Sequence, residues 1–230
     1  MVIALQRALV RPVALLRLTA DRESYREYMR LRESPGATGR EVELRIGRLA
    51  GRPVWVREGT GDVDRVWDVF IESPHLPPAK IQRRGLPLVW DVGAGTGMAA
   101  AEMALRWPEA RVVAIVDDPA DAALARRTVE PWDDRAEVVE APLTPESLGA
   151  LDGPPAYVWI DAGDAARELL TRDTNWAAEV GAIKVRVAGD YPAEQCAADL
   201  ERLGFKATCD ESVVLGVRSR PADSSLAGAV

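Results

Sequence analysis

The stretch that decides the fold is Leu88-Val89-Trp90-Asp91-Val92-Gly93-Ala94-Gly95-Thr96-Gly97-Met98-Ala99. It starts with a short apolar run that ends in an acid, and three alternate glycines follow. After the glycines the chain is rich in alanine as far as Trp107. This order predicts a strand, a glycine-rich turn and a helix. Glycine suits such a turn because the backbone must lie against a bound ligand without a Cβ in between.

The spacing of the glycines predicts the kind of ligand. A dinucleotide site prefers Gly-x-Gly-x-x-Gly, whereas here the third glycine comes one residue earlier and an acid, Asp91, precedes the first by two residues. A carboxylate there would repel two phosphates but can meet an ammonium group or a ribose hydroxyl. The pattern therefore predicts an S-adenosylmethionine site, and the alternative is an ordinary glycine-rich turn. The residues expected to contact the nucleoside are Asp91, Gly93, Ala94, Gly95 and Gly97.

Length and composition restrict the class of protein. The 230 residues, 47% of them hydrophobic, suffice for one α/β domain with an N-terminal extension. A net charge of -7 disfavours a general nucleic-acid binder. One histidine and two cysteines without metal-ligand spacing predict neither a metal site nor a disulfide framework, and a reducing cytoplasm fits this composition.

The chain divides into three expected parts. Residues 1–85 are expected to form a cap of helices and a β-hairpin, residues 86–218 a Rossmann-like cofactor domain, and residues 219–230 a loose tail. Met1 to Leu18 is expected to form an apolar helix broken by arginines, which packs on the domain or on a second subunit; contact with a membrane surface is the alternative. Packing on a second subunit would give a homodimer. No run approaches 18 uninterrupted apolar residues, so no transmembrane span is predicted. The expected cap elements are helix 21–32, the hairpin 41–46 and 54–57, and helix 63–72 with Asp62 as its cap.

Acids follow the expected strands of the cofactor domain. These strands cover 111–116, 137–140, 157–161 and 182–187, followed by a helix at 192–203 and a closing antiparallel pair at 205–208 and 212–217. Asp117 lies about 20 residues beyond the glycine turn, where an acid commonly accepts both ribose hydroxyls. Asp118 precedes Pro119. It either contacts the nucleoside together with Asp117 or only caps the next helix. Glu140 ends the next strand near the expected adenine position. Asp161 lies at the carboxyl edge, where it positions substrate, holds a cation or caps the helix 165–171.

Several motifs in this order resemble the FkbM family of S-adenosylmethionine-dependent methyltransferases. The matching stretches are Arg57-Glu58-Gly59-Thr60-Gly61-Asp62, Leu76-Pro77, the glycine motif, Trp107-Pro108, Asp118-Pro119-Ala120, Tyr191-Pro192 and Leu203-Gly204-Phe205. The glycine motif is shared by all class I methyltransferases, whereas the Arg-x-Gly-Thr-x-Asp loop is more particular. The resemblance implies methyl transfer to a hydroxyl of a small molecule, often a sugar or a secondary metabolite.

The chain departs from this family on the acceptor side. Val116 stands where the family has a glutamate at the end of its second strand, and Asp117 replaces it only with a shift of one residue. After the fourth strand only Asp161 remains in register, with Asp164 as a stand-in. The family's Glu-x-His becomes Arg186-Val187-Ala188. These changes favour either an unusual acceptor or a degenerate protein.

Candidate catalytic residues follow from the mechanism. Methyl transfer from a sulfonium is an in-line displacement that needs a base when the hydroxyl is not acidic. His75 is one candidate because imidazole titrates near neutrality and its proline-flanked loop precedes the cofactor domain; the alternative is a surface-loop histidine. Asp161 and Asp164 are the other candidates. Arg57 and Asp62 either shape the acceptor pocket or pair with each other.

Two other functions remain open. One is a methyltransferase-like protein that binds the cofactor or a protein partner without methyl transfer, and the altered acceptor positions favour it. The other is an NAD-binding oxidoreductase, which the glycine spacing and Asp91 disfavour. The identity of the acceptor, metal dependence and activity itself do not follow from the sequence.

Overall fold

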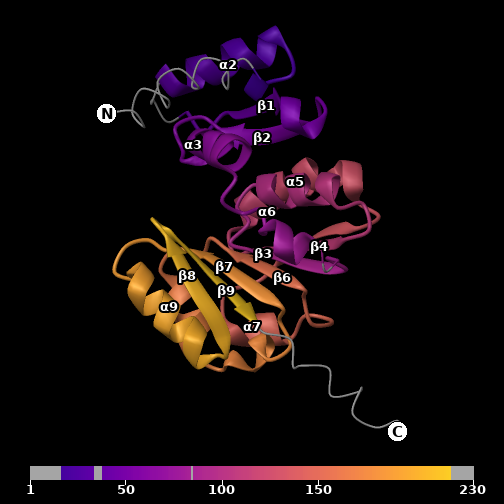
Figure 1. Ribbon diagram of the computed structural model, residues 1–230. Coiled ribbons are helices and arrows are strands. Elements are labelled where there is room, and N and C mark those ends of the chain that lie inside the picture. Colours follow the sequence, from indigo (N-terminus) through magenta and orange to yellow (C-terminus); the bar gives the residue numbers. More distant parts are fainter. Residues whose placement is uncertain (1–16, 34–37, 84, 219–230) are drawn as a thin grey trace, which may run out of the picture.

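The computed structural model describes residues 17–33, 38–83 and 85–218, which form a seven-stranded sheet, its covering helices and a two-stranded cap (Figure 1). The large sheet has the order β5-β4-β3-β6-β7-β9-β8. The first five strands are parallel, and β9 runs antiparallel to both of its neighbours. The strands are β3 (Leu88–Val92), β4 (Arg111–Val116), β5 (Ala136–Glu140), β6 (Tyr157–Ile160), β7 (Ala182–Arg186), β8 (Phe205–Asp210) and β9 (Val213–Arg218).

Helices cover both faces of this sheet. The crossovers between parallel strands supply α5 (Met98–Arg106), α6 (Pro119–Val129), α7 (Pro145–Gly149) and α8 (Ala165–Thr171), with short turns η3 (Glu130–Trp132) and η4 (Thr174–Ala177), and α9 (Ala193–Arg202) precedes β8. The apolar side chains of α5 and α6 belong to one buried cluster, and those of α7, α8 and α9 belong to a second one. The central strands are therefore buried on both sides, which explains their nearly continuous apolar sequences.

The cap packs on the α5 and α6 side of the sheet (Figure 1). Its elements are α2 (Arg22–Glu33), β1 (Glu41–Arg45), η1 (Gly47–Leu49), β2 (Pro53–Arg57), α3 (Asp62–Trp67), the π-turn η2 (Asp68–Glu72) and α4 (Ala79–Gln82). The backbone amide of Trp55 donates to Thr128 Oγ1 on α6 over 3.4 Å, and the guanidinium of Arg127 lies 3.5 Å from the centre of the Trp55 ring. Apolar residues of β1, β2 and α3 join the same cluster as α5 and α6.

The predicted elements are confirmed with ends that shift by one or two residues. The prediction that Asp62 caps its helix is wrong, because α3 begins at Asp62 itself and Gly61 is the N-cap residue. The carboxylate of Asp62 accepts instead from the backbone amide of Arg57 (3.0 Å) and from its Nε (2.9 Å), so the preceding strand occupies it. Asp118 caps α6 as predicted, accepting from two backbone amides. The apolar helix expected within 1–18, apart from its last two residues, and the tail 219–230 lie outside the described residues, and the division at residue 85 stays a prediction.

No helix within the described ranges is both long enough and apolar enough to cross a membrane.

Candidate functional site

The glycine-rich loop lies at the carboxyl edge of the sheet, between β3 and α5. Gly93, Gly95 and Gly97 have φ angles of 76°, 53° and 78°, which side chains rarely adopt. The backbone amides of Gly93 and Ala94 donate to the carbonyl of Ile115 on β4 over 3.0 and 3.1 Å. A Cβ at Gly93 would collide with the backbone oxygen of Asp161 at the end of β6. The three glycines therefore let the loop lie flat against two strand ends.

Asp91 is a buried acid that the protein leaves without a partner. Its side chain is inaccessible to solvent, and among the described residues neither carboxylate oxygen has a hydrogen-bond partner. Burial, reinforced by the nearby charge of Asp161, raises the pKa of Asp91 to about 7, against the opposing effects of Arg65 and of the backbone amide of Ala100. The hydroxyl of Thr96 in the same loop is also buried and has no hydrogen-bond partner in the part of the chain that the structure describes. Buried polar groups are normally satisfied, so this part of the protein fits a ligand with hydrogen-bond donors.

The acids that follow β4 differ in what they do. Val116, at the position of the family's acid, is buried, whereas Asp117 is exposed immediately after the strand. Oδ1 of Asp118 accepts from the amides of Ala120 and Asp121 over 2.8 and 2.9 Å, which makes it the N-cap of α6. Asp117 is thus the acid of this pair whose carboxylate is not occupied by capping.

Glu140 ends β5, next to the end of β4. Its carboxylate forms an exposed ion pair with Arg126 of α6 over 3.0 Å. Its predicted contact with the adenine stays a prediction.

Asp161 lies between two arginines from different parts of the chain. Its Oδ2 is 3.8 Å from Nη2 of Arg65 on α3 and 3.7 Å from Nε of Arg186 at the end of β7. Arg186 in turn forms an ion pair with Asp68 of η2 over 2.9 Å. Arg65 also reaches the glycine loop, where its Nη1 is 3.5 Å from the carbonyl oxygen of Gly93. The cap thus adds charged groups to the carboxyl edge of the sheet.

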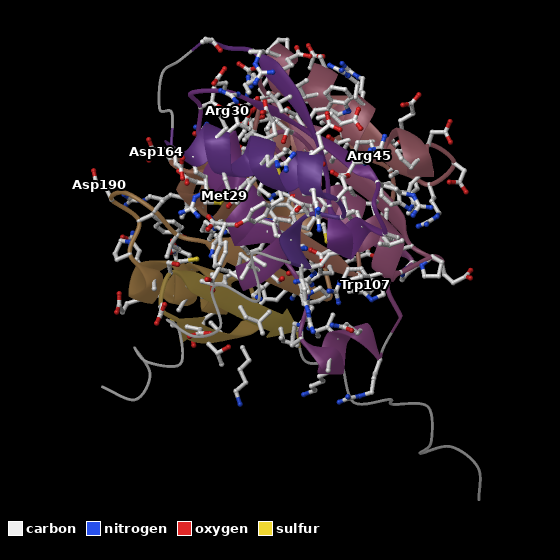
Figure 2. The ribbon with its side chains drawn as sticks, turned by 90° about the horizontal axis from the view of Figure 1, so that it is seen from above. Met29, Arg30, Arg45, Trp107, Asp164 and Asp190 are labelled. Carbon is white, nitrogen blue, oxygen red and sulfur yellow. The ribbon has the colours of Figure 1, made fainter. Side chains whose placement is uncertain are left out.

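Asp164 lies at the outer margin of this edge. It precedes α8, is exposed, and makes no capping bond. Figure 2 shows it at the periphery, near the loop that carries Asp190. A Cβ at Gly189 of that loop would lie 3.2 Å from Oδ1 of Asp164, so this acid and the β7–α9 loop are neighbours.

Arg57 and Asp62 pair with each other, as one of the two predicted alternatives required. The guanidinium of Arg57 also forms an ion pair with Asp121 on α6. The Arg-x-Gly-Thr-x-Asp loop is therefore closed on itself and fastened to the helix that follows β4. A role of these residues in an acceptor pocket stays a prediction.

His75 is neither a surface residue nor close to the other candidates. Its side chain is 1% exposed, and Nε2 lies 3.2 Å from Oε2 of Glu102 on α5. Its carbonyl accepts from the hydroxyl of Tyr157, at the amino end of β6. Asp161 follows the carboxyl end of that strand, four residues and about 13 Å further along. Burial lowers the pKa of His75, with the Glu102 charge opposing. The surface-loop alternative is wrong because the imidazole is buried against Glu102 of α5.

The structure therefore brings together Asp91, the glycine loop, Asp117 and Asp161, and it leaves His75 apart. Arg65 was not predicted as a site residue. Its signal in the sequence is only a charged residue on a short helix, and its approach to the loop depends on how the cap packs. Arg186 departs from the family's pattern, and its position at the end of an expected strand is the feature of the sequence that indicates a place in the site.

Comparisons with known proteins support this architecture. No protein-family model matches the chain. Curated tRNA1(Val) (adenine(37)-N6)-methyltransferases from two strains of Porphyromonas gingivalis are 38% identical over 65 residues, which is 27% of this chain. The chain matches about a quarter of the length of these relatives, 26%.

Solved structures match over a longer part of the chain. An O-methyltransferase family protein from Burkholderia thailandensis has a TM-score of 0.51 at 16% identity, covering 86% of this chain and 68% of that one. The S-adenosylmethionine-dependent methyltransferase SibL has a TM-score of 0.50 at 20% identity, with 86% and 69% covered. Precorrin-6y C5,15-methyltransferase from Geobacter metallireducens has a TM-score of 0.50 at 18% identity, with 64% and 88% covered. The chain has the class I methyltransferase fold.

A cleft lies in the cap, away from the glycine loop. It has a volume of about 640 Å³ and is lined by charged residues of α2, β1 and the segment between them, none of which is a candidate site residue. Within the described ranges no three His, Cys, Asp or Glu side chains are grouped as a metal site.

Proposed function

We propose that this protein is an S-adenosylmethionine-dependent methyltransferase that transfers a methyl group to a hydroxyl of a small molecule. The observation that carries the proposal is Asp91, a buried carboxylate at the head of the glycine loop that has no hydrogen-bond partner among the described residues. An unpaired buried charge is costly, and a cationic group of a ligand would offset that cost. The ammonium group of S-adenosylmethionine is such a group, and a loop without Cβ atoms allows a nucleoside to approach the backbone.

The other candidates take the remaining parts of the cofactor. Asp117 is our candidate for accepting the ribose hydroxyls; its support is that it follows β4 and that its neighbour Asp118, not Asp117, caps α6. Glu140 at the end of β5 is our candidate for the adenine. When bound, the cofactor supplies an electrophilic methyl group on its sulfonium. The protein must then hold the acceptor oxygen in line with that methyl group.

Asp161 and Asp164 are the candidate bases, since both follow β6 at the carboxyl edge. His75 as the base has less support, because its imidazole is buried against Glu102. The acceptor is proposed to be a sugar or a secondary metabolite in the cytoplasm, by the resemblance to the FkbM family. The tRNA acceptor of the P. gingivalis relative is less suited to this chain, because a net charge of -7 repels a polyanion.

A second candidate function is a protein that binds the cofactor without transferring its methyl group. The observation that favours it is the environment of Asp161, which lies within 4 Å of two arginines. A base candidate engaged by cations of its own chain is less available to an acceptor hydroxyl.

Calorimetric titration with S-adenosylmethionine and S-adenosylhomocysteine tests the proposal. We expect micromolar binding to the wild type and a loss of about a hundredfold in Asp91→Ala, because a charge-assisted contact of a buried group is worth roughly 1.5–3 kcal/mol. Release of S-adenosylhomocysteine in an acceptor screen separates the two functions. If the wild type binds neither nucleoside, both functions are excluded.

A further inference from the structure

The guanidinium of Arg65 lies directly on the glycine loop. Its Nη1 is 3.5 Å from the carbonyl oxygen of Gly93 and would be 2.5 Å from a Cβ at Gly95. Arg65 belongs to α3 of the cap, 28 residues before Gly93, so the cap and not the cofactor domain supplies this positive charge. The space above Gly95 is therefore filled by a flexible cation.

The guanidinium of Arg65 makes only long contacts with Gly93 and Asp161. The contact to Gly93 is at the outer limit of a hydrogen bond, and the distance of 3.8 Å to Asp161 Oδ2 is that of an ion pair without a close hydrogen bond. A guanidinium has five N–H donors arranged to bind a carboxylate with two parallel hydrogen bonds. The side chain is 35% exposed, so its remaining donors are accessible.

Asp91 lies at the end of β3, immediately before the same loop. It precedes Gly93 by two residues, its carboxylate is fully buried, and it has no hydrogen-bond partner within the part of the chain that the structure describes. The loop is thus flanked by an acid that lacks a cation and a cation that lacks a close anion. The two are near enough for Arg65 to lower the pKa of Asp91.

An α-amino acid group carries an ammonium and a carboxylate on one carbon atom, which matches this pair of charges. We propose that Arg65 binds the carboxylate of the cofactor's amino acid group while Asp91 binds its ammonium. This inference rests on the proposed function and goes beyond it, because it makes a cap residue part of the cofactor site. It also gives the cap a role in selecting the ligand: a nucleoside without an amino acid group would bind without the help of Arg65.

The alternative is that Arg65 only supports the loop. In that case its removal would disturb the loop for every nucleoside equally. The two roles therefore differ in how the loss depends on the ligand, and two ligands that differ only in the amino acid group distinguish them.

The experiment measures the affinities of S-adenosylhomocysteine and 5′-methylthioadenosine for four proteins by calorimetry. The proteins are the wild type, Arg65→Gln, Arg65→Lys and the control Arg22→Gln, which changes an exposed arginine of the same cap. We expect Arg65→Gln to weaken S-adenosylhomocysteine binding about ten- to a hundredfold, the range for a hydrogen bond between charged groups. Arg65→Lys should lose less, because it keeps the charge and loses the paired hydrogen bonds. The control should match the wild type.

The affinity for 5′-methylthioadenosine should change less than about twofold in all variants, and its binding shows that each variant is folded. Equal losses for both nucleosides, or no loss for either, would overturn the role of Arg65 and leave the proposed function intact. If the wild type bound 5′-methylthioadenosine as tightly as S-adenosylhomocysteine, the amino acid group would contribute nothing and the inference would fail. A wild type that binds neither nucleoside would exclude the proposed function as well.

Discussion

Two buried carboxylates, Asp91 and Glu102, lie on either side of the glycine loop in the unit formed by β3 and α5. Both side chains are at most 1% exposed. Glu102 has three neighbours that can carry positive charge: Nη2 of Arg48 at 2.5 Å, Nη2 of Arg106 at 2.8 Å and Nε2 of His75 at 3.2 Å. Within the described residues neither carboxylate oxygen of Asp91 has a hydrogen-bond partner, whereas Glu102 lacks one only at Oε2.

This difference in partners changes the pKa values of the two acids in opposite directions. It indicates a structural role for Glu102 and a ligand-binding role for Asp91. Burial raises the pKa of both acids, but His75 and the two arginines bring the pKa of Glu102 below its usual value overall. For Asp91 burial prevails and the pKa rises to about 7. A buried acid that is paired with cations of its own chain stabilises the packing between elements. Glu102 of α5 does this through Arg48 and His75 of the cap. A buried acid left without a partner is more useful to a ligand than to the fold.

The largest expected effect comes from replacing the unpaired acid. Because folding raises the pKa of Asp91, the folded state binds a proton that the unfolded state releases between about pH 4 and pH 7, and stability falls across this window. Asp91→Asn cannot ionise, so it removes the cost of burying this charge in the folded state. At pH 8 we expect the variant to gain up to about 4 kcal/mol in unfolding free energy, since the shift of about three pKa units corresponds to about 1.4 kcal/mol each. Urea denaturation of the ligand-free protein measures it.

At pH 5 the same substitution should gain less than half as much, because the folded wild type is then protonated. A variant less stable than the wild type at pH 8 would mean that Asp91 is already paired in the free protein, and the contrast with Glu102 would disappear.

Replacing the paired acid should have the opposite sign. In Glu102→Gln the arginines and His75 lose their common partner, and we expect a loss of about 2–3 kcal/mol, less than for a fully buried pair because Arg48 and Arg106 keep partial contact with water. Denaturation at pH 7 measures this loss. The control is Glu168→Gln, which breaks an exposed pair with Arg172 and should cost below about 0.5 kcal/mol. Equal costs for both variants would show that Glu102 is not a structural acid.

The smallest effect concerns the adjacent acids after β4. Asp117→Ala should weaken binding of S-adenosylhomocysteine about three- to tenfold, the value of a hydrogen bond or two to the ribose hydroxyls, with stability unchanged. Asp118→Ala should cost about 1 kcal/mol in stability through loss of the N-cap of α6, with affinity unchanged. Calorimetry measures the affinity of both variants and denaturation measures their stability; we expect each variant to change only one of the two quantities. Should Asp118→Ala weaken binding instead, the one-residue shift from the family's acid position would be wrong.

Local patterns predicted most of the fold. The strand, turn and helix around the glycine motif, and all seven strands of the large sheet, follow from apolar runs and turn residues that are close in sequence. Asp91 was predicted for the same reason, since its relation to the glycines is fixed by two residues of spacing. Asp118 as a cap was predicted from the proline that follows it.

What the sequence did not predict depends on packing between distant segments. Arg65 reaches the loop only because the cap, in which α3 contacts α2, β2 and η2, brings its guanidinium to Gly93. Nothing near Arg65 in the sequence indicates this. His75 follows a proline, which suggests an exposed loop, but its side chain is buried and pairs with Glu102, which lies 27 residues further on in α5. The sequence position of Asp62 favours a helix cap, but its carboxylate accepts hydrogen bonds from the backbone amide and the guanidinium of Arg57 across the turn.

The place of β9 bears on how the chain acquires this fold during synthesis. This strand comes after β8 in the chain but lies between β7 and β8 in the sheet. While the ribosome is still translating residues 213–218, β7 presents a bare edge and β8 lacks the neighbour with which it pairs. Such edges are where chains aggregate, so the nascent protein is exposed to this risk until its last described strand is inserted.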